Sequence, residues 1–234
     1  MIGELGKYLI RFKPSFPSKN QIFRYLAWNQ LKLALDSRQV NCVLDVGANK
    51  GQFAEGLRKI GYRGWIISFE PAPDDFAVMA GKLKRDPLWK GRQIALGGED
   101  KETTFNITLD DTRCNSILKP SRCGDEFRTV NVALRRLDSM FDELIAGIEA
   151  PRVFLKMDTQ GYDLEVIKGS AGCLDRVLGL LSEVAVEPNY EGMPLYLESL
   201  KTYEGLGFHL LGVSEIAWNH ERGTVAEMEC LMIR

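Results

Sequence analysis

A glycine-rich turn preceded by an acidic residue is the part of this sequence best suited to chemistry. The stretch Val43–Gly51 reads Val-Leu-Asp-Val-Gly-Ala-Asn-Lys-Gly. An apolar run that carries Asp45 leads into Gly47, and a segment with helical spacing follows Gly51. Glycines let a backbone turn tightly and come close to a ligand, where a Cβ atom would collide with it. The turn therefore predicts a cofactor site between a first strand and the helix that follows it.

The spacing of this turn indicates which cofactor it suits. It reads Asp-x-Gly-x-x-x-Gly, whereas dinucleotide enzymes carry Gly-x-Gly-x-x-Gly and present a helix N-terminus to a pyrophosphate. S-adenosylmethionine has no phosphate, so a carboxylate close to the turn is tolerable and useful. We therefore expect S-adenosylmethionine here. The expected contacts from the turn are Asp45, Gly47, Ala48, Asn49 and Gly51.

A second acidic residue supports a cofactor site. The run Trp65–Phe69 predicts a buried strand that ends at Glu70, roughly 20 residues after the glycines, where an acid can accept hydrogen bonds from a ribose diol. One such acid could merely cap a loop, but two acids around a glycine turn favour a cofactor site. NAD would also satisfy Glu70, so the glycine spacing carries the distinction. Pro71 belongs to the same site, and Ala95 and Leu96, which end a third predicted strand, are expected near the adenine.

Strand and helix patterns alternate along the chain, which predicts an α/β fold with a doubly wound, mostly parallel sheet. A small β insertion over 99–136 contains two alternating runs, 103–109 and 128–134, that read as an antiparallel pair. A last strand at 225–233 follows the sixth through a turn at 219–223, which predicts a seventh, antiparallel strand. Strands are expected near 42–46, 65–70, 92–96, 152–157, 178–186 and 208–213, and helices near 51–60, 74–85, 138–147, 162–170 and 195–206.

Candidate catalytic residues follow the later strands, because open α/β sheets bind ligands beyond the carboxyl ends of their strands. Asp158 follows the fourth strand and could orient an acceptor hydroxyl or take its proton. Glu183 lies inside an apolar run, where an unpaired charge is costly, so it should have a partner or face the pocket. His220, in the turn after the sixth strand, is a third candidate base. Asp158 is also expected to border the cofactor.

Metal chemistry is left open by the sequence. Asp158 and Glu183 could form a pair suited to acid–base work or to Mg²⁺, but oxygen sites usually need more ligands than two carboxylates supply. Mg²⁺ is therefore possible without being predicted.

The N-terminal region forms an extension ahead of the cofactor strand. Helical spacing over 20–35, with Ser18 or Asn20 as its cap, predicts a helix. The short amphipathic piece over 1–16 could cover the site, touch a membrane surface or simply pack on the domain. We expect an N-terminal helical extension over 1–40 and a methyltransferase domain over 41–234.

The composition indicates which partners and which cellular location to expect. The formal net charge of −2 gives no electrostatic footprint for nucleic acid, so no nucleic-acid partner is expected. No stretch approaches the ~20 apolar residues of a membrane helix, and the start lacks the pattern of a secretory signal. The five cysteines form no C-x-x-C pair and are odd in number, so we expect reduced cysteines and a cytoplasmic protein.

Several stretches in order resemble the FkbM family of S-adenosylmethionine-dependent methyltransferases. The resemblance implies the class I, Rossmann-like methyltransferase fold and cofactor roles for Asp45, Gly47, Asn49, Gly51 and Glu70. It also supports Asp158 as a pocket residue, although Met157-Asp158-Thr159-Gln160-Gly161 departs mildly from the family's usual Ile-Asp-Val/Ile-x-Gly. The matching stretches are VLDVGANKGQFAEGLRKIGYRGWIISFEPAP, CNSILKP, FLKMDTQGYDLEVIKGS, SEVAVEPNYEGMPLY and GFHLLGV.

Members of this family typically methylate hydroxyl oxygens on sugars, glycolipids, polyketides and related compounds. The resemblance therefore implies an O-methyltransferase whose partner is a small-molecule or glycan acceptor. A NAD-dependent oxidoreductase and a non-catalytic cofactor-binding protein are the alternatives. The sequence leaves the acceptor, the general base and the oligomeric state open.

Overall fold

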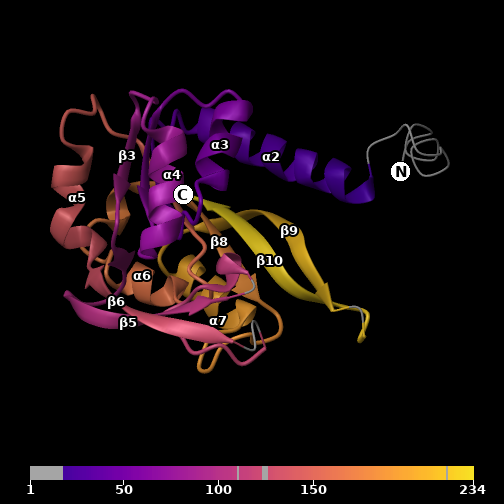
Figure 1. Ribbon diagram of the computed structural model, residues 1–234. Coiled ribbons are helices and arrows are strands. Elements are labelled where there is room, and N and C mark those ends of the chain that lie inside the picture. The colour runs from indigo at the N-terminus through magenta and orange to yellow at the C-terminus, as the bar shows by residue number, and fades with distance from the viewer. Residues whose placement is uncertain (1–17, 110, 123–125, 220) are drawn as a thin grey trace, which may run out of the picture.

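A central sheet organises the part of the chain that the computed structural model describes, which is residues 18–109, 111–122, 126–219 and 221–234. Its seven strands follow the order β3-β2-β1-β7-β8-β10-β9 (Figure 1). β10 is antiparallel to both neighbours, and the remaining pairs are parallel, which confirms the expected sheet. The strands are β1 (Cys42–Val46), β2 (Trp65–Phe69), β3 (Trp89–Arg92), β7 (Val153–Met157), β8 (Val177–Ala185), β9 (His209–Asn219) and β10 (Thr224–Ile233).

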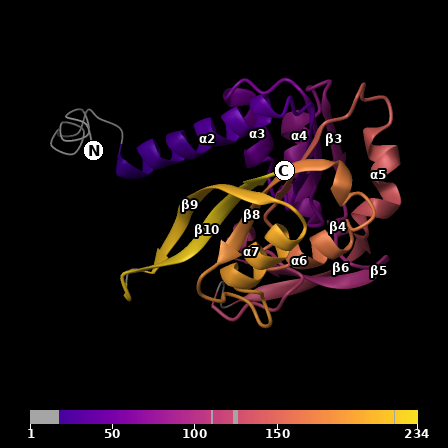
Figure 2. The same cartoon turned by 180° about the vertical axis from the view of Figure 1, so that it is seen from behind.

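Helices cover both faces of this sheet, so its inner strands are apolar on both sides. β1 and β7 are buried along their whole length. Val43 packs in a core with α2, α3 and α4, whereas Leu44 packs in a core with α5, α6 and α7 (Figures 1 and 2). The helices are α2 (Lys19–Ser37), α3 (Gln52–Lys59), α4 (Pro73–Leu83), α5 (Leu137–Ile145), α6 (Asp163–Lys168) and α7 (Tyr196–Gly205), with 3-10 turns η1 (Thr112–Cys114) and η2 (Leu174–Arg176).

The insertion after β3 forms a second sheet, of three strands, in the order β4-β6-β5. β4 is Ala95–Leu96, β5 is Lys101–Thr108 and β6 is Phe127–Arg135. β5 and β6 are antiparallel, as expected from their alternating patterns. The expectation of a third strand of the main sheet over 92–96 is wrong. The third strand, β3, covers Trp89–Arg92 and ends where its neighbour β2 ends, and Ala95 and Leu96 pair with β6 in the second sheet instead.

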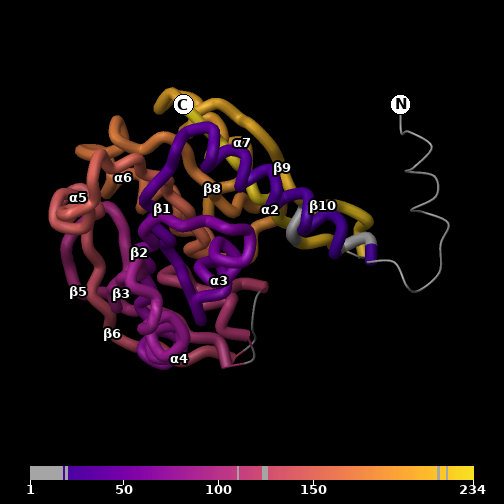
Figure 3. The backbone as a smooth tube through the Cα atoms, turned by 90° about the horizontal axis from the view of Figure 1, so that it is seen from above, coloured from indigo at the N-terminus to yellow at the C-terminus, as the bar shows by residue number. Residues whose placement is uncertain are grey.

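The N-terminal helix is longer than expected and is joined to the main core. Ser18 caps α2, and its side chain accepts a hydrogen bond from the backbone of Gln21. The second half of the helix buries Leu31 and Leu35 against the sheet, and Gln30 donates a hydrogen bond to the carbonyl of Leu211 in β9 (Figure 3). The division of the chain at residue 40 stays a prediction.

The last two strands form a long hairpin that reaches past the body of the molecule (Figures 1 and 2). β9 runs to Asn219, six residues beyond the end expected for the sixth strand at 213. β10 lies between β8 and β9 rather than at the sheet edge. The hairpin turn includes His220, which lies outside the described residues, so its role as a base stays a prediction.

The cysteines depart from the expectation that all are reduced. Cys114 is disulfide-bonded, whereas Cys42, Cys173 and Cys230 are free and buried. Cys123 lies outside the described residues. The expectation is therefore wrong for Cys114, and the cytoplasmic location stays a prediction. Within the part of the chain that is described, no helix has the length and apolar character needed to span a bilayer.

Candidate active site

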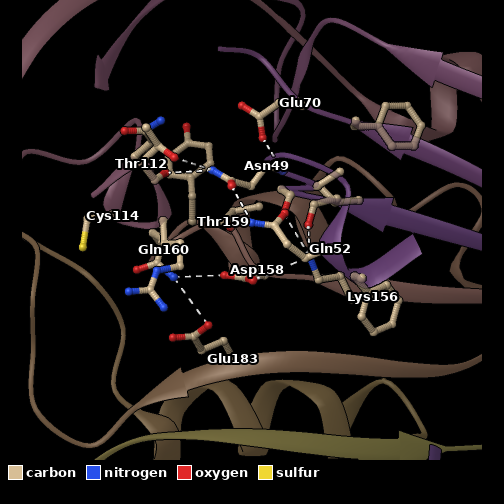
Figure 4. A pocket seen from close by; sticks show the side chains of 18 of the residues that line it. Asn49, Gln52, Glu70, Thr112, Cys114, Lys156, Asp158, Thr159, Gln160 and Glu183 are labelled. Atoms are coloured by element: carbon tan, nitrogen blue, oxygen red, sulfur yellow. Dashed lines mark hydrogen bonds and ion pairs between the residues drawn. The ribbon is translucent and has the colours of Figure 1, made fainter. Parts of the chain in front are cut away.

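A cavity of about 660 Å³ opens where β1, β2 and β7 end (Figure 4). This is the edge of a parallel sheet at which α/β proteins bind ligands, and the volume suits a cofactor-sized molecule. Most of the residues expected from the sequence line this cavity. They are Gly47, Ala48, Asn49, Glu70, Pro71, Ala95, Leu96, Asp158 and Glu183.

The two glycines of the turn have reasons in the fold itself. Gly47 has φ +71°, and a Cβ atom there would lie 1.9 Å from the carbonyl oxygen of Asp158. Gly51, at φ +83°, precedes α3, and a Cβ atom there would lie 3.1 Å from the side chains of Met79 and Leu83. Gly51 is not among the cavity-lining residues. Gly47 thus lets the β1 turn meet the β7 loop, while Gly51 lets α3 pack on α4.

Glu70 lies at the end of β2 with its carboxylate held in place by backbone donors. One oxygen accepts a hydrogen bond from the amide of Asn49 at 2.7 Å, and the other from the amide of Ala72 at 2.8 Å. The residue is 4% exposed. Burial raises the pKa of Glu70 to about 7, against the opposing effect of the two amides. The carboxylate therefore ties the glycine turn to β2 at the cavity wall.

The insertion forms part of the cavity wall and is hydrogen-bonded to the glycine turn and to α4. The Asn49 side chain donates hydrogen bonds to the carbonyl and hydroxyl oxygens of Thr112, at 3.0 and 3.2 Å. Asn115 donates to Asp75 in α4 at 3.1 Å. Thr112 and Asn115 both line the cavity. The sequence suggested that the insertion 99–136 helps to build the pocket but singled out neither residue, although Asn115 belongs to the CNSILKP stretch that carries the family resemblance.

Asp45 is enclosed below the cavity rather than exposed to it. It is fully buried, and its carboxylate is ion-paired with the ammonium of Lys156 in β7 at 3.0 Å and accepts a hydrogen bond from Ser68 at 3.2 Å. Lys156, which lines the cavity, also donates to the carbonyl of Gly47 at 2.9 Å. Direct contact between Asp45 and a cofactor stays a prediction, because the structure places Lys156 at the cavity instead.

Lys156 was missed by sequence reasoning because it stands inside a buried strand. Burial alone would lower its pKa, but the neighbouring charges of Asp45 and Asp158 raise it above the ordinary value. The Asp158 carboxylate lies 3.6 Å from the ammonium. The buried lysine is therefore a charged group held between two carboxylates at the end of β7.

Gln160 links the two carboxylates that were expected to do acid–base work. Its amide nitrogen donates to Asp158 at 2.9 Å and to Glu183 at 3.4 Å, and Figure 4 shows it between them. Its amide oxygen accepts a hydrogen bond from the hydroxyl of Tyr190 at 3.0 Å. The side chain of Asp158 is 38% exposed, so it keeps access to the cavity. The structure thus brings Asp158 and Glu183 together, as expected.

The wall next to this pair is acidic. Glu227 and Glu229, both in β10, line the cavity with Glu183. Burial raises the pKa of Glu183 well above its ordinary value, and the nearby charges of Asp158 and Glu227 add to the effect. Burial likewise raises the pKa of Glu229. A cluster of three or more side chains able to hold a metal ion does not occur among the described residues.

Comparison with known proteins decides the family. The methyltransferase FkbM domain matches residues 45–210, which is more than half of the chain. The protein belongs to the FkbM methyltransferase family. It is therefore an S-adenosylmethionine-dependent methyltransferase. The cavity is compatible with that cofactor, because it combines the carboxyl group of Glu70 with an apolar wall that includes Ile94, Leu96 and Phe105.

Two characterised methyltransferases are similar to this family member in sequence. Hexuronic acid methyltransferase AglP of Haloferax volcanii is 27% identical over 190 residues, which cover 79% of this chain and 74% of AglP. The 2-O-methyltransferase NoeI of Sinorhizobium fredii is 27% identical over 179 residues, which cover 69% of this chain and 72% of NoeI.

Solved methyltransferase structures share the fold. The methyltransferase domain of bacterial CtHen1-CN superposes with a TM-score of 0.51 at 10% identity, covering 91% of this chain and all of that domain. An S-adenosylmethionine-dependent methyltransferase of Leishmania major superposes with a TM-score of 0.50 at 9% identity, covering 92% of this chain and 74% of that protein. At such low identity these structures speak for the class I fold alone.

Proposed function

We propose that this enzyme methylates a hydroxyl oxygen of a sugar or glycan. The observation that carries the proposal is the position of Asp158, which lines the cavity at the end of β7 beside the glycine turn and is partly exposed. A carboxylate in that position can accept the proton of an acceptor hydroxyl. The printed activities of AglP and NoeI, a hexuronic acid methyltransferase and a 2-O-methyltransferase, support the same class of acceptor.

The residues divide the work between cofactor and acceptor. S-adenosylmethionine supplies an electrophilic methyl group. Glu70 holds the ribose of the cofactor, and the turn with Gly47 and Ala48 holds its amino-acid part. Lys156 lines the cavity next to that turn. Asp158 accepts the acceptor proton as the oxygen–methyl bond forms, and alignment of the hydroxyl by the cavity lowers the barrier.

Glu183 has a different role from Asp158 in the proposed reaction. Burial and its acidic neighbours raise the pKa of Glu183, which favours the protonated form, and in that form the carboxyl group can donate a hydrogen bond. Gln160 holds the two carboxyl groups in one network. Asp158 therefore acts as the base, and Glu183 orients an acceptor oxygen. No step of this proposal requires Mg²⁺.

The carboxyl groups on the cavity wall should make the enzyme prefer acceptors that carry no negative charge. Glu183, Glu227 and Glu229 line the cavity together, and an anionic ligand would interact unfavourably with whichever of these carboxyl groups is ionised. We expect a neutral glycoside or an amino sugar to be a better acceptor than a uronic acid. In this respect the enzyme would differ from its relative AglP.

Methyl transfer to a panel of glycosides tests the proposal. Purified enzyme receives S-adenosylmethionine with an isotope-labelled methyl group and either a glucoside, a glucosaminide or a glucuronide. Asp158→Asn is expected to lower kcat at least about a hundredfold. Asp175→Asn, which changes an exposed carboxylate in η2, is the matched control and should keep full activity.

Three outcomes of this experiment would contradict three separate parts of the proposal. Full turnover by Asp158→Asn would show that another group is the base. If none of the three glycosides receives the label, the proposal of a sugar acceptor is wrong. A glucuronide methylated as fast as the glucoside would contradict the role given to the acidic wall.

A further inference from the structure

The outer face of α2 carries apolar side chains that nothing in the described chain covers. Tyr25 is 68% exposed, Leu26 is 55% exposed and Leu33 is 69% exposed. Leu26 and Leu33 share one face of the helix, because positions seven apart lie above one another, and Tyr25 borders that face. Leu31 and Leu35 lie on the opposite face and are buried in the core. The helix is therefore apolar on two sides, and among the described residues only the side with Leu31 and Leu35 is covered by the core.

The N-terminal half of α2 reaches away from the body of the molecule. In Figure 1 the helix extends past the central sheet, in the same direction as the hairpin of β9 and β10, and Figure 3 shows the same arrangement from above. Tyr25 and Leu26 lie in this projecting half. Because this half of the helix projects, its exposed apolar face can contact an external surface while the rest of the protein stays away from that surface.

Charge is distributed unevenly between this end of the chain and the rest. Residues 1–24 contain five basic residues and one acidic residue, a net charge of +4, whereas the whole chain has a net charge of −2. The remaining residues therefore carry a net charge of −6. The basic residues are Lys7, Arg11, Lys13, Lys19 and Arg24.

We propose that the outer face of α2 docks on an anionic lipid surface. An apolar helix face enters the boundary between headgroups and acyl chains, and nearby basic residues are attracted to anionic lipids. The acidic remainder of the chain is repelled by the same surface, so the charge asymmetry also orients the protein. A second copy fits this face less well, because pairing would bring together two α2 helices that each carry a net charge of +2, from Lys19, Arg24 and Lys32 against Asp36.

Docking through α2 would place the cavity next to the lipid surface. Arg24 and Trp28 belong to the same helix and line the cavity. An acceptor carried at a membrane surface would then approach the cavity from the α2 side. This inference goes beyond the proposed function, and the test below does not depend on methyl transfer.

Vesicle sedimentation with the full chain tests the proposal. The probes are vesicles of phosphatidylcholine with and without phosphatidylglycerol, at low and high salt. The wild-type protein is expected to bind the anionic vesicles about tenfold more tightly than the neutral ones, and to lose that preference in high salt. Leu26→Ser/Leu33→Ser should weaken binding to anionic vesicles about tenfold.

The matched control removes two exposed apolar side chains elsewhere. Val78→Ser/Leu197→Ser changes residues of α4 and α7 that are 43% and 66% exposed, and it should bind vesicles like the wild type. Absence of wild-type binding to anionic vesicles, or equal binding by both double variants, would overturn the proposal. So would light scattering that shows a wild-type dimer which Leu26→Ser/Leu33→Ser converts to a monomer, because the face would then bind a second copy.

Discussion

Cofactor affinity should depend on pH through Glu70. The buried carboxyl has a pKa of about 7, raised mainly by burial, although two backbone amides favour its ionised form. An ionised carboxylate can accept hydrogen bonds from both ribose hydroxyls, whereas a protonated one uses one oxygen as a donor. Binding should therefore require the ionised form and release a proton wherever Glu70 is protonated in the free enzyme.

The size of the effect follows from the fraction of enzyme that is ionised. One pH unit below its pKa, only about a tenth of Glu70 is ionised, so the apparent Kd for S-adenosylhomocysteine should rise about tenfold between about pH 8 and about pH 6. Stability should change in the opposite sense. The folded-state pKa lies above the ordinary value of 4.5, so protonation of Glu70 stabilises the free enzyme by about 3 kcal/mol below pH 4.5, and this contribution is lost as pH rises through about 7. Between about pH 6 and about pH 8 the free energy of unfolding should fall by about 1 kcal/mol.

Calorimetric titration with S-adenosylhomocysteine measures both affinity and proton release. Titrations at about pH 6, 7 and 8 in two buffers with different ionisation enthalpies give the number of protons released. Glu70→Gln should bind weakly at every pH and lose the Glu70-dependent proton release. An affinity that is independent of pH in the wild type, or a pH dependence that Glu70→Gln retains, would refute the reasoning.

Two further predictions concern the groups that hold the site together. Gly47→Ala should cost at least about 2 kcal/mol in urea unfolding, because its Cβ atom would meet the Asp158 carbonyl at 1.9 Å; Gly61→Ala, at φ +90° with no atom within 4 Å, is the control and should cost about 1 kcal/mol. Equal losses for the two variants would contradict the steric argument. Lys156→Met should cost about 3–5 kcal/mol, because it leaves Asp45 buried without its ion-pair partner. Adding Asp45→Leu should recover part of that loss, and no recovery would show that the pair itself is not responsible.

The sequence predicted the sheet and most of the cavity wall on this side because those features depend on local patterns. Apolar runs that end in Asp158 and Glu70 marked strands with polar residues at their carboxyl ends, and the structure places both residues at the cavity. The glycine turn was placed correctly for the same reason. Its physical explanation changed, since the close contact of Gly47 is with the backbone of Asp158.

What the sequence could not show depends on contacts between distant segments. The partners of Lys156, which are Asp45 and the carbonyl of Gly47, lie more than 100 residues away in the sequence and are brought beside it only by the fold. Thr112 lies in an irregular part of the insertion, where no periodic pattern predicts which way a side chain points. Ala95 was assigned to the wrong sheet because a short apolar run fits either one.

The position of the transferred methyl group tests the central claim most directly. Nuclear magnetic resonance of the product made with isotope-labelled S-adenosylmethionine distinguishes a methyl ether from a methyl ester or a methylamine. Methylation of a sugar hydroxyl predicts a methyl ether whose formation is lost in Asp158→Asn. A methyl ester or methylamine, or formation of S-adenosylhomocysteine with no methylated sugar, would contradict it.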